Sequence, residues 1–307
     1  MIEVLASESS EKMKNIVNTI QSEQNAVIRN ITDKNLIVSG IAGSGKTSVA
    51  LHRIAFLLYK IKNLTSSKVL IFSPNSIFTE YISNVLPELG EDNTLQTTFN
   101  DYMEKELVGF KKVENYVDFI GRYYKNGENN KKLVLYKQSD GIIKDMEDFV
   151  SDYVENAKFT NSFTENEIYT ISKDEVNEML RKRYDSLVLF DRLDTIADKL
   201  SERNYKGTHK KSATYRKLLL QNSNFTSDFK EIFCKFFQSD FAKIKMSDKE
   251  LEQFKNSQEI KYEDALILTY LKGLLEGFGY EKYIEQVIID EAQDYSFLQY
   301  KILKQIF

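Results

Sequence analysis

The chain of 307 residues contains few residues of the kinds that cross-link or interrupt a fold: one cysteine, two histidines, two prolines and twelve glycines. The single Cys234 excludes an internal disulfide and a zinc site built from cysteines, and its phenylalanine-rich surroundings predict a buried thiol. The two histidines, His52 and His209, leave little scope for histidine chemistry. Scarce proline and glycine, with many Lys, Glu, Leu and Asn, predict a mostly helical protein whose strands form a minority core.

Long apolar runs are also absent from the sequence. No run approaches the roughly 20 residues that a membrane-spanning helix needs, and the first 14 residues lack the basic-then-apolar order of a signal peptide. We therefore expect a protein that acts in the cytoplasm, without a membrane partner. A formal net charge of −4 argues against a wholly basic protein that coats nucleic acid. A local basic track is still compatible with that charge.

One glycine-rich stretch organises the rest of the chain. Residues 40–47 read Gly-Ile-Ala-Gly-Ser-Gly-Lys-Thr and fit the phosphate-binding pattern G-x-x-x-x-G-K-[ST] at every defined position. The apolar run at residues 36–38 predicts a strand before it, and apolar residues at helical spacing over residues 48–59 predict a helix after it. Because strand, loop and helix are the context in which this pattern binds nucleotides, we predict ATP binding here.

Each part of the loop has a chemical reason. Glycines let the backbone bend without a Cβ clash, so that N–H groups and the helix N-terminus converge on phosphate oxygens. Lys46 supplies a positive charge for the β- and γ-phosphates, and the Thr47 hydroxyl is placed to ligate Mg²⁺. The predicted ATP-binding residues of the loop are Gly40, Ile41, Ala42, Gly43, Ser44, Gly45, Lys46, Thr47 and Ser48.

An apolar run that ends in two acids supplies the expected second half of the site. Residues 287–291 read Val-Ile-Ile-Asp-Glu. Asp290 would hold Mg²⁺, usually through water, and Glu291 would polarise the attacking water. An Asp-Glu pair after a strand is weak evidence alone, since most such pairs are solvated strand ends. Together with the upstream loop it becomes strong evidence.

Short apolar runs at residues 68–72, 94–99 and 283–289 predict three further strands. Helical periodicity predicts helices around these strands, at residues 11–29, 77–86, 260–277 and 296–307. The first of these helices brings Gln24 to the foot of the strand expected at residues 36–38.

A long interval separates the phosphate loop from the two acids. From about residue 101 to residue 259, charged amphipathic helical patterns replace the short β-branched runs. We therefore expect an α/β fold with a parallel sheet assembled from residues 1–100 and 260–307. A largely helical subdomain would be inserted over residues 101–259.

These motifs together resemble the UvrD/Rep/PcrA-type helicases of superfamily 1. Residues 42–47, followed by His-Arg-Ile-Ala at 52–55, resemble motif I and its helix, and Asp-Glu-Ala-Gln-Asp at 290–294 resembles motif II. Gln24 matches the Q motif that reads the adenine edge. The resemblance implies a P-loop NTPase fold of the RecA-like type, and it implies catalytic roles for Lys46, Glu291 and Gln293.

Within that superfamily, several short motifs of the sequence look more like those of the HelD branch, which acts on bacterial RNA polymerase. These are Ala-Leu-His-Arg at residues 50–53, Ser-Pro-Asn at 73–75 and Gln-Ser-Glu-Gln at 21–24, while Ser48 stands where classical members carry arginine. The leading interpretation is an ATP- and Mg²⁺-dependent DNA helicase or translocase, with 3′-5′ polarity implied by the resemblance. The alternatives are a HelD-like ATPase that remodels or recycles RNA polymerase, and a nucleotide-binding remnant without turnover.

The resemblance covers the first motor half only. Motifs III to VI, a second RecA-like domain and its transition-state arginines are not recognisable in the sequence. We therefore expect a second RecA-like domain as a partner, and very slow ATP hydrolysis by this chain alone.

Candidate nucleic-acid contacts follow from the same resemblance. In such motors the single strand crosses the tops of the RecA-like domains, which points to Ser73, Asn75, Thr98 and Phe99, with Phe99 stacking on a base. An ordinary strand-end turn is the alternative. The basic run at residues 206–217, including Lys210 and Lys211, would grip duplex phosphates, although a solvated loop explains it as well.

Overall fold

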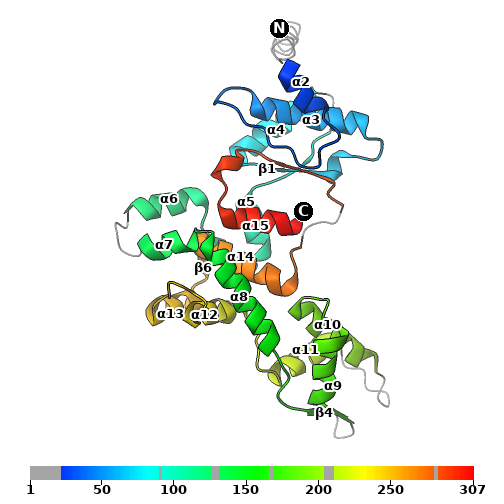
Figure 1. Cartoon of the computed structure of the whole chain (residues 1–307), viewed down its shortest axis with the longest axis vertical. Coiled ribbons are helices and arrows are strands. Elements are labelled where there is room, and N and C mark those ends of the chain that lie inside the picture. The colour runs from blue at the N-terminus through cyan, green and yellow to red at the C-terminus, as the bar shows by residue number, and fades with distance from the viewer. Residues whose placement is uncertain (1–21, 90–91, 126–130, 166–168, 204–210, 280–282) are drawn as a thin grey trace. The chain divides into compact units, whose positions relative to one another are not determined.

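The computed structural model describes residues 22–89, 92–125, 131–165, 169–203, 211–279 and 283–307. The chain divides into two compact units (Figure 1). The first consists of Met1–Phe99 with Glu281–Asp294, and the second of Asn100–Tyr280 with Tyr295–Phe307. The second unit includes the helix predicted at residues 260–277, which we had expected in the ATP-binding part. Among the described residues, no helix has the length and apolar character to cross a membrane.

The first unit is built on a three-stranded parallel sheet in the order β2-β1-β7. Its strands are β1 (Val69–Phe72), β2 (Leu95–Thr97) and β7 (Gln286–Ile289), and Leu70 of β1 pairs with Leu95 on one side and Val287 on the other. All four residues of β1 are buried, as expected for a central strand covered on both faces. All three strands come from segments outside residues 101–259, which confirms the predicted α/β fold with its parallel sheet.

Helices pack against this sheet through apolar faces. α3 (Lys46–Lys60) and α4 (Ser76–Glu88) form a core with β1, and their buried members include Leu51, Ile54, Leu57 and Ile82. Each such side chain contributes about 1.5–3 kcal/mol when fully buried. The predicted helix at residues 48–59 is confirmed by α3, and α2 (Ser22–Arg29) is the described part of the helix predicted at residues 11–29. Residues 11–21 lie outside the described residues.

The strand predicted at residues 36–38 does not form. The segment has no strand assignment, and Ile37 and Val38 have exposed fractions of 93% and 38%. Strand preference reflects the fit of a side chain to a paired, half-buried surface, and here no ladder or covering face is present. The strand predicted at residues 94–99 is also shorter than expected, since Phe99 begins α5 (Phe99–Glu106).

The second unit is mainly helical, as predicted for the interval that makes up most of it. Two small two-stranded sheets accompany the helices, β3 (Lys112–Val113) with β6 (Glu259–Ile260) and β4 (Phe163–Glu165) with β5 (Tyr169–Ile171). Its helices in the described residues are α5 from Asn100 onward, α6 (Tyr116–Lys125), α7 (Lys131–Lys137), α8 (Gly141–Asn156), α9 (Lys173–Glu178), the π-helical turn Met179–Arg183, α10 (Leu189–Glu202), α11 (Ser212–Gln221), α12 (Phe229–Gln238), α13 (Asp248–Asn256), α14 (Tyr262–Glu276) and α15 (Phe297–Ile306).

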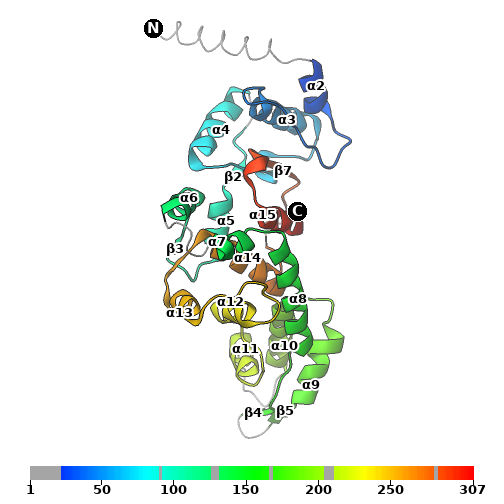
Figure 2. The ribbon, with the colours of Figure 1, turned by 60° about the vertical axis from the view of Figure 1, so that its left-hand side comes forward.

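The central element of the second unit is α14. It is buried on nearly every side, and α8, α10, α12 and α15 pack around it (Figure 2). Its apolar residues from Ala265 to Leu271 face every direction around the helix, as expected for a helix in a core. Cys234 of α12 is buried in the same unit with a free thiol, which confirms the sequence-based prediction.

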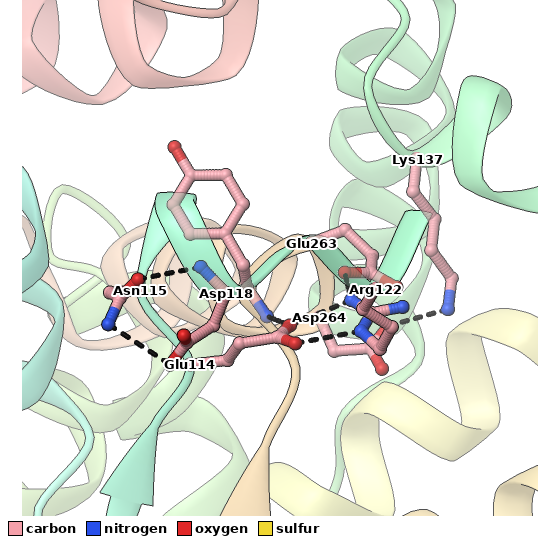
Figure 3. A network of polar contacts seen from close by, with 8 residues as sticks. Glu114, Asn115, Asp118, Arg122, Lys137, Glu263 and Asp264 are labelled. Atoms are coloured by element: carbon pink, nitrogen blue, oxygen red, sulfur yellow. Dashed lines mark hydrogen bonds and ion pairs between the residues drawn. The ribbon is translucent and has the colours of Figure 1, made fainter. Parts of the chain in front are cut away.

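An ionic network holds the start of α14 (Figure 3). Glu263 and Asp264 lie in its first turn, where carboxylates are favoured by the helix dipole. Arg122 of α6 donates two hydrogen bonds of 2.7 Å to Glu114 and one of 2.5 Å to Glu263. Lys137 of α7 donates to Asp264 at 2.5 Å. Five charges, of which Glu263, Asp264 and Lys137 are buried, are thereby paired within one unit.

The two acids that share Arg122 shift in opposite directions. Burial alone would raise the pKa of Glu114, but hydrogen bonds from Arg122 and from the Tyr262 N–H outweigh burial, so the pKa is lowered. Burial and the neighbouring Asp264 raise the pKa of Glu263 in spite of Arg122. Glu263 is more deeply buried than Glu114, and this burial outweighs the contact with Arg122 that lowers the pKa of both acids.

Candidate nucleotide-binding site

The loop at residues 40–47 has the shape that phosphate binding requires. Gly43 and Gly45 have φ angles of 78° and 82°, a region where only glycine is unstrained. A Cβ on Gly40 would lie 2.6 Å from the Ser44 Oγ. α3 begins directly after Gly45. Because glycine has no side chain, no side chain caps the N-terminus of this helix. The first N–H groups of α3, which lack intrahelical acceptors, are thus left to an anion.

The charged end of the loop folds back over its own backbone. The Nζ of Lys46 donates to the carbonyl oxygens of Gly40 and Ile41 at 3.0 and 3.1 Å. These are exposed hydrogen bonds, and Ile41 has an exposed fraction of 82%. Ser48 follows on the first turn of α3, where its carbonyl oxygen accepts from the Nδ1 of His52 at 2.8 Å. A bound phosphate would replace the two neutral carbonyl acceptors of Lys46 with a charged acceptor. A hydrogen bond to a charged acceptor is the stronger one.

Two oxygen ligands meet from opposite ends of the sequence. The Thr47 Oγ1 lies 3.1 and 3.2 Å from the two carboxylate oxygens of Asp290 and donates to them. Asp290 is held at the end of β7 by its N–H, which donates to the Phe72 carbonyl at 3.0 Å. In the described part of the chain no group of three His, Cys, Asp or Glu side chains could hold a metal. A hydroxyl and one carboxylate fit Mg²⁺, which takes its other ligands from phosphates and water.

Glu291 follows in an unusual conformation. Its φ is 47°, the one non-glycine residue with positive φ among the described residues, a state that costs roughly 1–2 kcal/mol for a residue with a Cβ. Its N–H donates to Asp290 at 3.0 Å, and the side chain of Gln293 donates to the Glu291 carboxylate. The turn after β7 therefore holds the Glu291 backbone through Asp290 and the Glu291 carboxylate through Gln293.

Gln24 reaches the loop from α2. Its Nε2 donates to the Ser44 carbonyl at 3.1 Å, so the predicted base reader is brought to the phosphate loop. The first unit thus joins Gln24, Lys46, Thr47, Asp290 and Glu291 around one loop.

Comparison with known families agrees with this geometry. A sequence model of the UvrD/REP helicase N-terminal domain matches residues 20–307. The chain belongs to this family. It is therefore a UvrD-type superfamily 1 helicase domain, from a family of ATP-dependent motors that act on nucleic acid. A search of curated proteins gives no significant match.

The four candidate nucleic-acid contacts of the helicase domain follow β1 and β2, and they differ in their exposure to solvent. Asn75 is exposed, and its side chain accepts from the Phe78 N–H at 3.2 Å. Ser73 and Thr98 are buried, at 1% and 9% exposed. Phe99 is buried against Phe72, with ring centroids 6.5 Å apart, which argues against base stacking in this conformation. Phe99 opens α5 instead of ending a strand.

The helicase domain's candidate basic run is only partly described. Lys210 lies outside the described residues, whereas Lys211 is exposed immediately before α11. Arg216 pairs with Asp194 at 2.6 Å, so part of the charge is already neutralised.

Sequence reasoning assigned no role to Arg53, which the structure places beside α2. Its Nη1 donates to the carbonyl oxygens of Val27 at 2.9 Å and Ile28 at 3.4 Å, and to that of Asn30. A signal was present in the sequence, because Arg53 is an isolated cation among the apolar residues of its helix. Its partners are backbone groups, which no sequence pattern marks.

Proposed function

We propose that this UvrD-like domain binds Mg-ATP and hydrolyses it to drive translocation along DNA. The observation that carries the proposal is the contact between Thr47 and Asp290, at 3.1–3.2 Å. It brings the hydroxyl of the phosphate loop and the acid at the end of β7 to one point. Together these two residues supply the protein ligands that a P-loop enzyme offers to magnesium.

The remaining side chains divide the chemistry between them. Lys46 neutralises the γ-phosphate, and the N–H groups at the start of α3 bind the other phosphate oxygens. Glu291 accepts the proton of the attacking water, and Gln293 orients Glu291 through its hydrogen bond. Magnesium, when bound, neutralises charge that spreads over the transferred group.

One component of this chemistry must come from outside the first unit. Phosphoryl transfer is typically accelerated by about 10³–10⁵ when an arginine stabilises the transition state. The sequence of this unit contains only Arg29 and Arg53, and Arg53 is occupied by the end of α2. We infer that a second RecA-like domain supplies the arginine and that hydrolysis by this chain alone is very slow.

Binding of Mg-ATP measured by titration calorimetry tests the proposal. Lys46→Ala should abolish detectable binding, because it removes the charge that meets the phosphates. Lys60→Ala, at the exposed C-terminal end of the same helix, is the matched control and should leave the dissociation constant unchanged. Equal ATP affinity in the Lys46→Ala variant and the parent chain would refute the proposal.

A HelD-like role at RNA polymerase is the second candidate. It is favoured by two short sequence motifs, His52-Arg53 and Ser73-Pro74-Asn75, which resemble that branch. The two roles differ in what stimulates ATP turnover in an assembled motor. Stimulation by single-stranded DNA, with 3′-5′ movement on a tailed duplex, supports the helicase. Stimulation by polymerase and not by free DNA supports the alternative.

A further inference from the structure

Arg53 connects two elements that both reach the nucleotide site. It lies two turns along α3 from the phosphate loop, and α2 crosses beside this part of α3 (Figure 1). Its guanidinium donates to Val27 and Ile28 at the C-terminal end of α2, and to Asn30 just beyond that end. The last carbonyl groups of a helix have no intrahelical donors and carry the negative end of the helix dipole. A guanidinium placed there satisfies several of them at once.

This anchor matters because α2 is short. It has eight residues, and isolated helices shorter than roughly 12–15 residues are marginal in water. Its position therefore depends on contacts with the rest of the unit. Partial burial lowers the pKa of Arg53 while the nearby Asp33 raises it, and the side chain stays cationic.

The acceptor beyond the helix is itself held in place. The Asn30 Oδ1 accepts from the N–H groups of Thr32 and Asp33 at 3.0 and 3.1 Å, and the Asn30 side chain donates to Asp33 at 2.6 Å. Arg53 thus binds a turn whose shape is fixed by its own hydrogen bonds, and a shift of α2 relative to α3 would have to break the hydrogen bonds from Arg53.

At its other end α2 carries Gln24, about one turn before Val27. The Gln24 side chain donates to Ser44 of the loop at 3.1 Å, and a Cβ on Gly45 would lie 3.7 Å from its Nε2. A rotation of α2 would displace this amide relative to the loop but would leave the loop's own hydrogen bonds unchanged.

We propose that Arg53 is a positioning residue for base selection: it holds α2 so that Gln24 meets the base of a nucleotide whose phosphates occupy the loop. This inference rests on the proposed function, in which Gln24 contacts the base. It separates two parts of nucleotide affinity, because Arg53 should affect recognition of the base and leave recognition of the phosphates unchanged.

Titration calorimetry on the whole chain with two ligands tests this separation. Mg-ATP carries base and phosphates, whereas magnesium tripolyphosphate carries phosphates alone. Arg53→Met, which keeps the apolar stem, should weaken ATP binding by about tenfold, the effect of one lost hydrogen bond. Its tripolyphosphate affinity should equal that of the parent chain, and this also shows that the unit is folded. Arg53→Lys should give a smaller loss, since an ammonium keeps the charge without the planar fork.

Two further variants distinguish positioning from a general loss of structure. Arg29→Met removes the exposed cation in the last turn of the same helix and should change neither affinity. Gln24→Ala should reproduce the ATP-specific loss. The double variant Arg53→Met/Gln24→Ala should be no weaker than either single variant, because both act on the same contact.

The outcomes that overturn the inference differ from those that overturn the proposed function. Equal losses for ATP and tripolyphosphate in Arg53→Met would show a structural role for Arg53. Additive losses in the double variant, or no ATP-specific loss in Gln24→Ala, would show that Arg53 does not act through Gln24. If the parent chain bound neither ligand, the proposed function itself would fail.

Discussion

The two units use their charged side chains in opposite ways. In the second unit Glu263, Asp264 and Lys137 are 2–3% exposed, and each is paired inside the unit. In the first unit the hydrogen bonds of Lys46 are exposed and end on backbone carbonyls of its own loop. The buried charges of the helical unit are satisfied by other charges, whereas Lys46 of the phosphate loop keeps capacity for a ligand. Burial and pairing therefore distinguish charges that stabilise the fold from charges that await a substrate.

This contrast has an energetic basis. A buried charge that loses its partner is left desolvated, so each pair in the helical unit must remain complete. An exposed charge can exchange a carbonyl for water or phosphate at little cost. Substitutions in the buried pairs of the helical unit should consequently change the free energy of unfolding, and substitution of Lys46 should change ligand binding.

The largest expected effect tests whether the charges of the first unit are incomplete for catalysis. A second RecA-like domain from another member of the family, supplied in trans, should raise ATP turnover by about 10³–10⁵ through its arginine. Phosphate release from the mixed proteins measures the effect, and Glu291→Gln should stay inactive in the mixture. If the isolated chain turned over at a full motor's rate and did so independently of Glu291, both the missing arginine and the assigned base would be wrong.

The next effect tests the pairing in the helical unit. Arg122→Met removes the shared partner of Glu114 and Glu263 and should lower the free energy of unfolding by about 3–5 kcal/mol. Urea unfolding followed by circular dichroism measures the change. Arg181→Met, at an exposed position, is the control and should stay within about 0.5 kcal/mol of the parent chain. Equal stability of the two variants would contradict the contrast between units.

A smaller effect appears in the pH dependence of the same network. The pKa of Glu114 is lowered in the fold, so its stabilisation is present above its unfolded pKa of about 4.3 and is lost as the pH falls through the lower folded value. Glu114→Gln should thus cost about 1.5–3 kcal/mol at pH 7, the worth of a hydrogen bond to a charged group, and less at pH 3. Urea midpoints across this range measure it.

The contribution of Glu263 to stability should change with pH in the opposite direction in the same experiment. Its pKa is raised, so its contribution is full below the unfolded value and is lost as the pH rises through the higher folded value. Glu263→Gln should therefore cost more at pH 3 than at pH 7. Parallel pH profiles for the two variants would show that burial and Asp264 do not raise the pKa of Glu263 against the effect of Arg122.

The smallest effect compares glycines of the two units. Gly43 has a φ of 78° and Gly109 has no positive φ, and a Cβ on either would meet nothing within 4 Å. Gly43→Ala should lower stability by about 1–2 kcal/mol through backbone strain alone. Gly109→Ala should be neutral or raise stability by up to about 1 kcal/mol. Thermal melting of both variants measures the difference, and the same sign for both would exclude strain as the cause.

Local patterns were enough to predict the parts of this protein that depend on neighbours in the sequence. The phosphate loop with α3, and the apolar run that becomes β1, could be placed because glycine spacing and apolar periodicity act over a few residues. The strand expected at residues 36–38 failed because a strand also needs a partner, which its own residues do not specify.

Long-range polar contacts were beyond prediction for a related reason. The partners of Arg53 are carbonyl groups, which every residue carries, so its place could not be deduced from side-chain types. Arg122 lies 141 positions from Glu263, and neither residue stands in a recognisable motif that links them. Asp290 was placed beside Thr47 from the resemblance and the paired motifs, and the structure brings the two together.

The left-handed backbone at Glu291 sets selection for folding against selection for activity. Glycine or asparagine adopts that conformation at lower cost than glutamate. A library of position-291 variants chosen only for solubility or heat resistance should fill with those two residues, whereas one chosen for ATP turnover should return glutamate. Lineages released from turnover would lose this glutamate early. The identity of one residue would then tell a working motor from a remnant that only binds nucleotide.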